Sequence, residues 1–404
     1  MYYTRTLESH ILKASKQFPA LLLTGPRQIG KTTLLKHLCE DERTYVSLDD
    51  LSIRDLANND PVLFLQRFKP PLLIDEIQYA PDLLPYIKIE ADRTRKNGAF
   101  WLTGSQQFHL MKGITESLAG RVAIINLFGF SRAEKYRKAS SRPFLPEKSY
   151  QNQNKTIDID TLFKDIWLGF FPALCAGTVT DSNLFYSSYI QTYIERDIRD
   201  LSQVGDSRAF LRFIRVCAGR TAQLLNMSDI ARDTDISVTT AKKWLGVLES
   251  SFQVFIVPSY HSNLTKRLVK APKLYFFDTG LCAHLTGWTS PETLMSGSMS
   301  GAIFENYVLL EILKSWYYQL KTLNIYYYRD KDKKEIDFLI EQNNMLYPIE
   351  VKLGATPKQE WLRQFSVLKK LKKKIGPGVV ISFAGNPLPL SESVWAINAG
   401  DMII

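Results

Sequence analysis

The sequence predicts an α/β protein that begins with a doubly wound parallel sheet, and three observations predict this class. Short apolar runs alternate with longer amphipathic stretches through residues 1–130, a glycine-rich loop follows the first run, and two acidic residues follow the third. Such alternation is typical of buried strands joined by crossover helices. The expected strands are Ala20–Thr24, Thr44–Leu48, Pro71–Ile74, Ala99–Thr103 and Arg121–Leu127.

Composition narrows the class of protein. The chain has 404 residues, a length typical of two or three domains, and its 45% hydrophobic and 23% charged content excludes wholesale disorder. Its 51 basic and 41 acidic residues give a net charge of +10, which favours a polyanionic partner.

The four cysteines lie far apart, which excludes a CxxC zinc site and a disulfide scaffold. Because no secretory signal or bilayer-spanning run is visible, we expect a cytoplasmic protein with no membrane partner.

Changes in composition suggest domain boundaries. The chain turns polar and irregular between Lys135 and Asp160, and again between Thr286 and Gly301. The stretches between and after these breaks return to apolar patterns that suit helices and strands. We therefore expect a core at 1–134, a polar loop and helical lid or linker at 135–220, a compact helix-helix-strand-strand unit at 221–285 and a final α/β unit at 298–404.

The loop after the first strand matches a phosphate-binding motif. Residues 25–32 read GPRQIGKT, which fits G-x-x-x-x-G-K-[ST] between a strand and an apolar helix. Backbone N–H groups in such a loop cradle phosphate, the lysine reaches the β- and γ-phosphates, and the threonine is a ligand of Mg²⁺. A glycine turn without a ligand is the alternative. The expected binding residues are Gly25, Pro26, Arg27, Gln28, Ile29, Gly30, Lys31, Thr32 and Thr33.

Two acidic residues follow the apolar strand at Leu72–Ile74. Buried carboxylates at the end of a strand are unfavourable unless a cation or a hydrogen-bond donor meets them. We expect Asp75 to join Thr32 in the Mg²⁺ shell and Glu76 to polarise the water that attacks the γ-phosphate. A strand that ends in solvated acids is the alternative.

Further positions are candidates for contact with the γ-phosphate. Ser105 or Gln106, shortly after the strand that ends at Thr103, is placed to sense it, although turn chemistry alone also explains these polar residues. Arg121 is placed to reach the γ-phosphate of a neighbouring subunit and to stabilise transition-state charge. A local salt bridge is the alternative for Arg121.

Several segments form a combined pattern: Gly25–Thr33, Val46–Asp50, Leu73–Pro81, Leu102–Phe108, Ser117–Val122, Tyr193–Ile198, Tyr275–Leu281, Glu335–Ile340 and Pro348–Lys352. Together they resemble prokaryotic AAA-superfamily ATPases that have a C-terminal domain of unknown function. The resemblance implies a P-loop AAA-type sheet in which the strand before Ser105 lies between the phosphate-loop and Asp-Glu strands. It also implies a homo-oligomer that binds ATP and Mg²⁺, with each site completed by Arg121 of a neighbour. One departure is Phe170, where the family usually has a second glycine after Gly169.

The middle of the chain has the pattern of a winged helix. Ser228 and Ser237 are expected to cap two short helices, which two apolar strands follow, Phe252–Val257 and Leu274–Phe277. The basic segment Leu264–Lys270 would form the wing. Such a unit either binds DNA through its second helix and wing or serves as a protein-protein module. The residues expected to face a DNA groove are Thr239, Thr240, Lys242 and Lys243.

The last unit places acids and a lysine on neighbouring elements. Asp337 lies in an apolar strand, and Glu350 and Lys352 share one face of the next strand, after a turn at Asn343–Asn344. Glu305 lies in a preceding apolar helix. This order resembles the restriction-endonuclease-like fold of the PD-(D/E)xK nucleases, which implies that the carboxylates hold Mg²⁺ while the lysine orients or activates water. Metal-dependent cleavage and nucleic-acid docking without cleavage both remain open.

These features lead to one functional hypothesis and one alternative. We expect an AAA-type ATPase that binds and hydrolyses ATP with Mg²⁺. Its nucleotide state is coupled to a winged-helix and nuclease-like module that engages nucleic acid, with DNA favoured. The alternative is a nucleotide-gated protein-interaction scaffold, whose nuclease-like domain is catalytically silent and whose partner is another protein or a sibling subunit.

Overall fold

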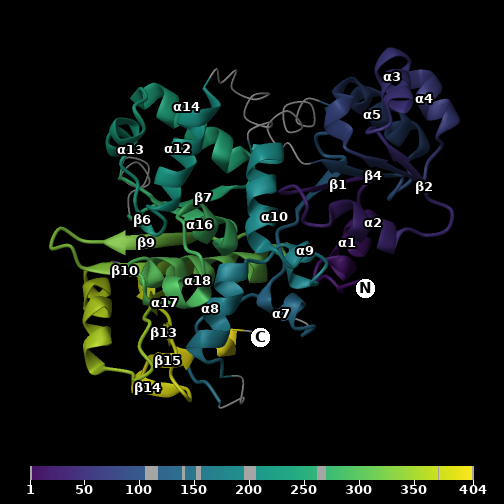
Figure 1. Cartoon of the computed structure of the whole chain (residues 1–404). Coiled ribbons are helices and arrows are strands. Elements are labelled where there is room, and N and C mark those ends of the chain that lie inside the picture. The colour runs from purple at the N-terminus through teal and green to yellow at the C-terminus, as the bar shows by residue number, and fades with distance from the viewer. Residues whose placement is uncertain are drawn as a thin grey trace.

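The computed structural model describes residues 2–104, 117–138, 142–151, 156–194, 206–261, 270–371 and 373–402. Figure 1 shows the N-terminal sheet and its helices on one side of the molecule, and the middle and C-terminal elements on the other. Among the described residues the longest helix is α18 (Ser300–Tyr317), which lies within the second group. The predicted α/β class is confirmed.

The N-terminal sheet is a 5-stranded parallel sheet in the order β2-β3-β4-β1-β5. Each strand agrees with its predicted range to within one residue at either end. The order also confirms that β4 lies between β1 and β3, as the resemblance implied. The bounds are β1 (Ala20–Thr24), β2 (Thr44–Ser47), β3 (Leu72–Asp75), β4 (Phe100–Gly104) and β5 (Val122–Asn126).

Helices cover both faces of this sheet. Alternate side chains of β1 enter two different cores, Leu21 and Leu23 on one face and Ala20 and Leu22 on the other, because strand side chains alternate. The first face packs against α1 (Glu8–Ser15) and α2 (Lys31–Leu38). The second face packs against α3 (Leu51–Asn59), α4 (Pro61–Arg67) and α5 (Leu84–Thr94). Short 3₁₀ turns at Ile77–Tyr79 and Pro81–Leu83 connect β3 to α5.

The middle of the chain is mainly helical and contains a 3-stranded antiparallel sheet in the order β6-β8-β7. The helices before this sheet are α7 (Arg132–Lys135), α8 (Ile159–Leu168), α9 (Pro172–Cys175), α10 (Ser182–Tyr189), a π-helical turn at Ile190–Ile194 and α12 (Ser207–Ala218). The elements from the sheet onward are β6 (Gln223–Leu224), α13 (Met227–Thr234), α14 (Val238–Ser250), β7 (Val254–Val257), β8 (Lys273–Phe276), α16 (Thr279–Leu285) and α17 (Pro291–Ser296).

Some details of the middle region differ from the sequence-based expectation. The cap of α13 is Asn226, whose side chain accepts from two backbone N–H groups, so the prediction of Ser228 was wrong. Ser237 caps α14 as predicted. The short strand β6 was not predicted, because two residues are too few to give a periodic pattern. In the expected wing, residues 264–269 lie outside the described residues.

The C-terminal unit is a mixed sheet beside α18. Its main strand order is β14-β15-β13-β11-β10-β9, with β12 paired to β11. β10 and β11 are antiparallel neighbours, and their turn residues Asn343 and Asn344 have φ values of +50° and +59°, which suit a tight hairpin turn. The predicted hairpin is therefore confirmed. The bounds are β9 (Ile325–Arg329), β10 (Glu335–Gln342), β11 (Met345–Val351), β12 (Lys374–Ile375), β13 (Gly378–Ser382), β14 (Leu388–Ser391), β15 (Val394–Asn398) and the 3₁₀ segments Gln359–Lys370 and Ala399–Met402.

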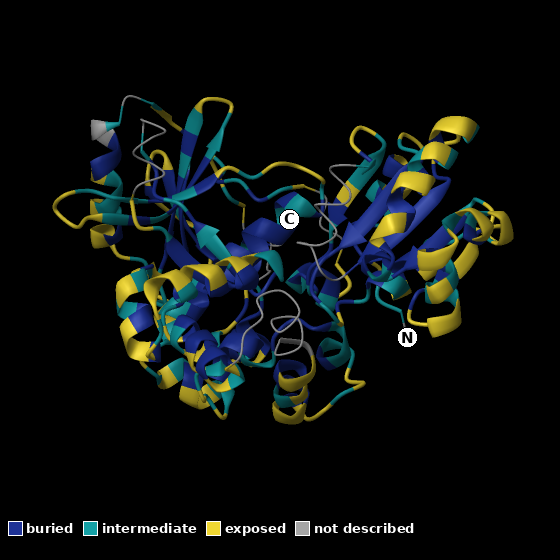
Figure 2. Cartoon of the chain, turned by 90° about the horizontal axis from the view of Figure 1, so that it is seen from above, coloured by how far each residue is buried: buried dark blue, intermediate teal, exposed yellow. Residues whose placement is uncertain are grey.

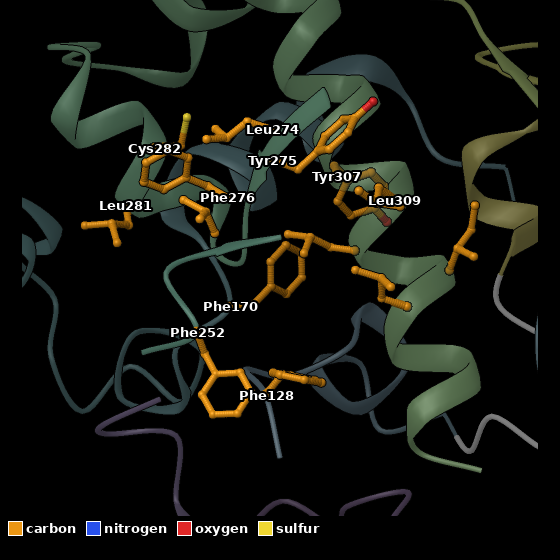
Figure 3. Close-up of a cluster of buried hydrophobic side chains, with 14 of the residues drawn as sticks. Phe128, Phe170, Phe252, Leu274, Tyr275, Phe276, Leu281, Cys282, Tyr307 and Leu309 are labelled. Carbon is orange, nitrogen blue, oxygen red and sulfur yellow. The ribbon is translucent and has the colours of Figure 1, made fainter. Parts of the chain in front are cut away.

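One hydrophobic core joins the three parts of the chain. It extends from Leu7 to Met402 and includes side chains from β1, the phosphate loop, α18 and the C-terminal sheet. Figure 2 shows buried residues along the strands of both large sheets. At the junction the Phe128 ring stacks on Phe277 with centroids 4.8 Å apart and meets Phe252 edge-on at 5.7 Å. Figure 3 shows Phe128 beside Phe252 in this core. The parts therefore pack as one body.

Gly169 occupies a position that only glycine fits. Its φ is +75°, and a Cβ there would lie 2.1 Å from the Tyr186 hydroxyl and 2.5 Å from the Asp278 carboxylate. Asp278 caps α16 and also accepts from the Phe170 backbone N–H and the Tyr186 hydroxyl. Phe170 itself is not among the residues with positive φ, and its buried ring stacks near Tyr307. The second glycine of the family pattern is thus not required by this backbone.

We expect Gly169→Ala to lower the free energy of unfolding by about 2–4 kcal/mol, because it adds the strain of a backbone conformation that essentially only glycine adopts (φ +75°, ψ −170°) to overpacking against Tyr186 and Asp278. Gly177→Ala is the matched control, since Gly177 has a φ of +68° but open space around its Cβ direction. It should cost about 1 kcal/mol, from backbone strain alone. Urea unfolding measures both, and equal losses would contradict the packing argument.

Candidate functional site

The loop after β1 has the backbone of a phosphate cradle. Gly25, Gln28 and Gly30 have φ values of +143°, +60° and +86°. Successive changes of backbone handedness turn several N–H groups toward one side, which forms an anion-binding concavity. A Cβ on Gly25 would lie 2.0 Å from the Leu127 carbonyl oxygen, so this position also needs glycine for close packing. The loop leads directly into the N-terminus of α2 at Lys31.

The other predicted loop residues differ in exposure. Pro26 and Ile29 are buried, and they line a cavity of about 20 Å³ together with Phe128 and residues of the middle region. Gln28 and Thr33 are exposed, and Arg27 is half-buried. One side of the loop therefore packs on the middle region.

Lys31 lies over the loop. Its side chain is buried, and its ammonium donates to the carbonyl oxygens of Gly25 at 3.1 Å and Pro26 at 2.7 Å. An ammonium held there lies against the cradle in which phosphate oxygens would sit. The predicted contact of Lys31 with phosphate is compatible with this position.

Asp75 is a meeting point for hydroxyl groups at the carboxyl edge of the sheet. One carboxylate oxygen accepts from the Thr32 hydroxyl at 2.8 Å and from the Thr103 hydroxyl, and the other accepts from the Tyr45 hydroxyl at 3.0 Å. Burial and the Asp75 charge raise the pKa of Tyr45 to about 12. The site thus places an oxygen of the buried Asp75 carboxylate within hydrogen-bond distance of the Thr32 hydroxyl, in the first turn of α2. Such hard oxygen donors suit Mg²⁺.

Glu76 has an unusual backbone conformation. Its φ and ψ are 58° and 48°, in the left-handed region that costs a non-glycine residue about 1–2 kcal/mol. The backbone N–H donates to the Thr103 hydroxyl at 3.1 Å, and the carboxylate accepts from the Gln78 side-chain amide. These contacts fix the carboxylate just beyond Asp75. Strain of this kind is typical of functional sites.

The sequence did not identify every contact in this site. Ser105 and Gln106, the expected sensors, lie outside the described residues. The polar residue of β4 that the structure places at the site is Thr103, whose hydroxyl contacts Asp75 and the Glu76 backbone N–H. Tyr45 and Gln78 were also missed, because neither belongs to a motif that predicts contact with the two acids.

Arg121 lies at the opposite end of the sheet from the loop of its own chain. Its backbone carbonyl accepts from the Ala20 N–H at the amino end of β1, about 16 Å along the strand from the loop. Its side chain pairs with Asp92 at 2.6 Å and donates to the Ala119 carbonyl. Hydrogen bonding within this pair lowers the pKa of Asp92 and raises that of Arg121. Within one chain, Arg121 therefore forms the local salt bridge.

The predicted C-terminal residues lie near one another around β10 and β11. The Lys352 ammonium pairs with Glu350 at 2.5 Å, and the Asp337 carboxylate accepts from the Val351 N–H at 2.8 Å. Glu305, on α18, accepts from the Tyr275 hydroxyl at 2.6 Å and pairs with Lys273 at 3.1 Å. Lys273 also pairs with Glu335 at 2.5 Å. We refer to Glu305, Asp337, Glu350, Lys352 and Lys273 as the C-terminal cluster.

Comparison with protein families agrees with the geometry of the N-terminal part. Residues 17–136 match the family described as AAA domain. The N-terminal unit has an AAA-type P-loop ATPase fold. We call residues 17–136 the AAA unit. Residues 159–292 match a domain of unknown function, DUF8612, and residues 300–402 match another, DUF4143.

Individual proteins are also similar to parts or all of this chain. The chain is 29% identical to the uncharacterized protein Rv2008c of Mycobacterium tuberculosis over 405 residues, which cover 99% of this chain and 84% of that protein. The uncharacterized protein Mb2031c of Mycobacterium bovis matches equally. A Walker-type ATPase of Pyrococcus abyssi has 16% identity and a TM-score of 0.44, over 70% of this chain and 96% of its own. The RuvB branch migration motor of Thermotoga maritima has 16% identity and a TM-score of 0.29, over 62% of this chain and 87% of its own. In the described ranges no helix is long and apolar enough to cross a bilayer.

Burial and mutual repulsion shift the titration of the C-terminal cluster. Burial, followed by the Asp337 charge, raises the pKa of Glu305 to about 7 and that of Glu350 to about 8. Burial also raises the pKa of Asp337. For Lys273 burial acts to lower the pKa, but the carboxylates of Glu305, Asp337 and Glu335 outweigh it, so the pKa is raised. The cluster is therefore an electrostatically strained group of acids balanced by the buried Lys273 and the half-buried Lys352.

The cluster does not fit a divalent cation in this arrangement. One carboxylate oxygen of Glu350 is buried and has no hydrogen-bond partner among the described residues, as a metal ligand would. However, no three His, Cys, Asp or Glu side chains of the described part lie close enough to hold a metal ion. The ammonium of Lys273, from β8, already forms ion pairs with Glu305 and Glu335. The sequence missed Lys273 because it comes from a different part of the chain.

Proposed function

We propose that the protein binds ATP in its AAA unit and hydrolyses it with Mg²⁺. The proposal rests on one observation, the Asp75 carboxylate that joins the Thr32 and Thr103 hydroxyls beside Lys31 and Glu76. This arrangement gathers a phosphate cradle, two hard oxygen donors and a second carboxylate at one edge of the sheet. ATP hydrolysis needs each of these groups.

Binding would use the loop and α2. The loop N–H groups and the Lys31 ammonium would hold the β- and γ-phosphates, with Lys31 exchanging the Gly25 and Pro26 carbonyls for phosphate oxygens. Thr32 and Asp75 are the residues that would hold Mg²⁺. The bound ion would neutralise charge on the phosphate oxygens.

Hydrolysis would use Glu76. Its carboxylate lies directly beyond the metal-binding acid and is oriented by Gln78 and by the Thr103–backbone contact. From this position it would orient the attacking water and accept its proton. Its left-handed backbone follows directly after the last residue of β3, Asp75, which supports assigning different roles to the two acids.

We further propose that the AAA unit works in a homo-oligomer, in which Arg121 contacts the γ-phosphate of a neighbouring subunit. Arg121 is too far from the loop of its own chain to act there. The Asp92 pair is half-exposed at the surface, so a partner phosphate could replace the Asp92 carboxylate at little cost. An arginine is suited to this task because its charge is permanent and its fork binds phosphate in two places.

A second proposal concerns the middle region, which we interpret as a winged-helix unit that contacts nucleic acid. Its order of α12, β6, α13, α14, β7 and β8, with a three-residue turn between α13 and α14, supports this interpretation. Thr239, Lys242 and Lys243 lie on the exposed face of α14. A net charge of +10 favours a polyanionic partner. Because the C-terminal cluster does not fit a metal ion, we propose no cleavage step and regard it as catalytically silent.

We expect Glu76→Gln to lower kcat for ATP at least 100-fold with little change in ATP affinity, because only the base is lost. Lys31→Ala should instead abolish binding as well as turnover. Lys13→Ala, a charge-matched change in α1, is the control and should keep wild-type activity. Phosphate release and nucleotide binding measure the two steps, and a Glu76→Gln protein as active as the wild type would remove Glu76 from the mechanism.

We expect Arg121→Ala to lower kcat about 1000-fold in the assembled oligomer, through loss of transition-state stabilisation in trans. Asp92→Ala breaks the same ion pair but keeps the arginine, so its turnover should remain near that of the wild type. Light scattering must show the same oligomer in all three proteins. Equal loss of activity in both variants would show that only the local salt bridge matters.

We expect a duplex DNA probe to bind at low salt, with an affinity that falls steeply as salt rises. The double variant Lys242→Ala/Lys243→Ala should weaken binding at least 5-fold and flatten the salt dependence. Lys13→Ala/Lys16→Ala removes the same charge at a distant helix and is the control. Fluorescence anisotropy measures each protein with and without ATP. Absence of binding in both nucleotide states, together with nucleotide-dependent oligomers, would favour the scaffold alternative.

A further inference from the structure

Arg5 is buried at the junction of the AAA unit and α18. Its exposed fraction is 4%, and its guanidinium donates to the carbonyl oxygens of Ile29 at 3.2 Å and Phe128 at 2.8 Å. The same group donates to the Tyr318 hydroxyl at 3.2 Å and pairs with Glu134 at 3.1 Å. One side chain thus contacts the phosphate loop, the segment after β5, α7 and the residue that follows α18.

Stability alone is a poor explanation for this arrangement. Burying an arginine and a carboxylate costs several kcal/mol per ion in desolvation, and a well-packed apolar pair is often as stable. Arg5 recovers part of that cost because its two terminal nitrogens donate to the carbonyls of Ile29 and Phe128 and to the Tyr318 hydroxyl, while its Nε makes only the ion-pair contact with Glu134. Glu134 is equally constrained, since it also accepts from the backbone N–H groups of Thr6 at 2.8 Å and Ser131 at 3.0 Å. The network therefore fixes geometry.

The contact with Ile29 has a direct consequence for the loop. In a trans peptide the C=O and the next N–H point in opposite directions. Because the Ile29 carbonyl points at Arg5, the N–H of Gly30 points away from it. Gly30 is the loop glycine directly before Lys31, with a left-handed backbone that most easily changes its peptide orientation. Arg5 thus restrains the peptide group whose N–H is needed for phosphate.

The other end of the network belongs to the C-terminal part of the chain. The Tyr318 hydroxyl accepts from Arg5 and donates to the Gly129 carbonyl at 2.6 Å. In α18 itself, Lys314 donates to the Phe130 carbonyl at 2.7 Å. The same helix bears Glu305 of the C-terminal cluster, about 20 Å away at 1.5 Å per residue. A rigid, almost wholly buried helix therefore connects the two places.

We propose that Arg5 is a positioning residue for the nucleotide site, which holds the Ile29–Gly30 peptide in its phosphate-binding orientation and is itself held by Tyr318 at the end of α18. The inference rests on the proposed function, since it assumes that the loop binds ATP. If Arg5 has this role, a change at α18 alters the affinity for nucleotide through Tyr318 and Arg5. By the same coupling, ATP binding alters α18.

The test uses the affinity of the full-length protein for a fluorescent ATP analogue with Mg²⁺. Arg5→Lys keeps the charge next to Glu134 but cannot reach Ile29, Phe128 and Tyr318 together, so we expect at least a 10-fold loss of affinity. Tyr318→Phe removes one hydroxyl and should weaken binding about 5-fold, since one hydrogen bond is worth roughly 1 kcal/mol. If Arg5→Lys fails to fold, Tyr318→Phe still tests the proposal, because it leaves Arg5 in place.

The matched control is Arg43→Lys. Arg43 is likewise buried, donates to the Gly98 carbonyl at 2.9 Å and pairs with Glu40 at 3.2 Å, but has no contact with the loop among the described residues. It should lose stability with less than a 2-fold change in affinity. Equal effects of Arg5→Lys and Arg43→Lys, or none from Arg5→Lys, would overturn the positioning role. Unchanged affinity in Tyr318→Phe would overturn the connection to α18. A wild-type protein that binds no nucleotide would instead overturn the proposed function.

Discussion

The buried carboxylate of Asp75 is the contact on which the proposed nucleotide site depends. β1, β3 and β4 are parallel neighbours in the order β3-β4-β1, so their carboxyl ends meet at one edge of the sheet. Asp75 ends β3 there and accepts hydroxyls from Thr32, which follows the β1 loop, and Thr103, near the end of β4. A carboxylate in this place would be costly without these donors. The same hydrogen bonds therefore satisfy the buried acid and align the loop, α2 and Glu76.

The carboxyl edge of the N-terminal sheet is in contact with the middle and C-terminal parts of the chain. The segment just after β5 meets Gly25 of the loop through Leu127 and the middle region through Phe128. Its Gly129 and Phe130 carbonyls accept from Tyr318 and from Lys314 of α18. A continuous hydrophobic core surrounds these contacts. Because close-packed interiors transmit displacement instead of absorbing it, a change in the loop has a short physical path to the C-terminal sheet. This arrangement is compatible with the proposal that the rest of the chain responds to nucleotide at the loop.

Local patterns in the sequence predict much of this architecture. The five core strands and their order, the α14 cap at Ser237 and the hairpin at Asn343–Asn344 all follow from apolar runs, capping residues and turn chemistry or from the family pattern. These features depend on residues close together in the sequence, or on a motif whose letters are distinctive. The grouping of Lys31, Thr32, Asp75 and Glu76 was predicted for the same reason.

Contacts between distant segments could not be predicted in this way. Lys273 meets Glu305 and Arg5 meets Tyr318 across 32 and 313 positions, and neither lysine nor arginine stands in a motif. The expected site at Glu305, Asp337 and Glu350 illustrates the same limit, since the order of acids and lysine in the sequence does not reveal that Lys273 pairs with Glu305. Periodicity indicates which face of an element is buried, and not which charge arrives there from another part of the fold.

Calorimetric titration of ATP into the intact protein tests the central claim most directly. With Mg²⁺ present the account predicts heat from a single site per chain, and a clear loss of affinity when EDTA removes the ion or when Asp75→Asn weakens its binding. Heat that is absent for ATP with Mg²⁺, from protein shown to be folded, would contradict it.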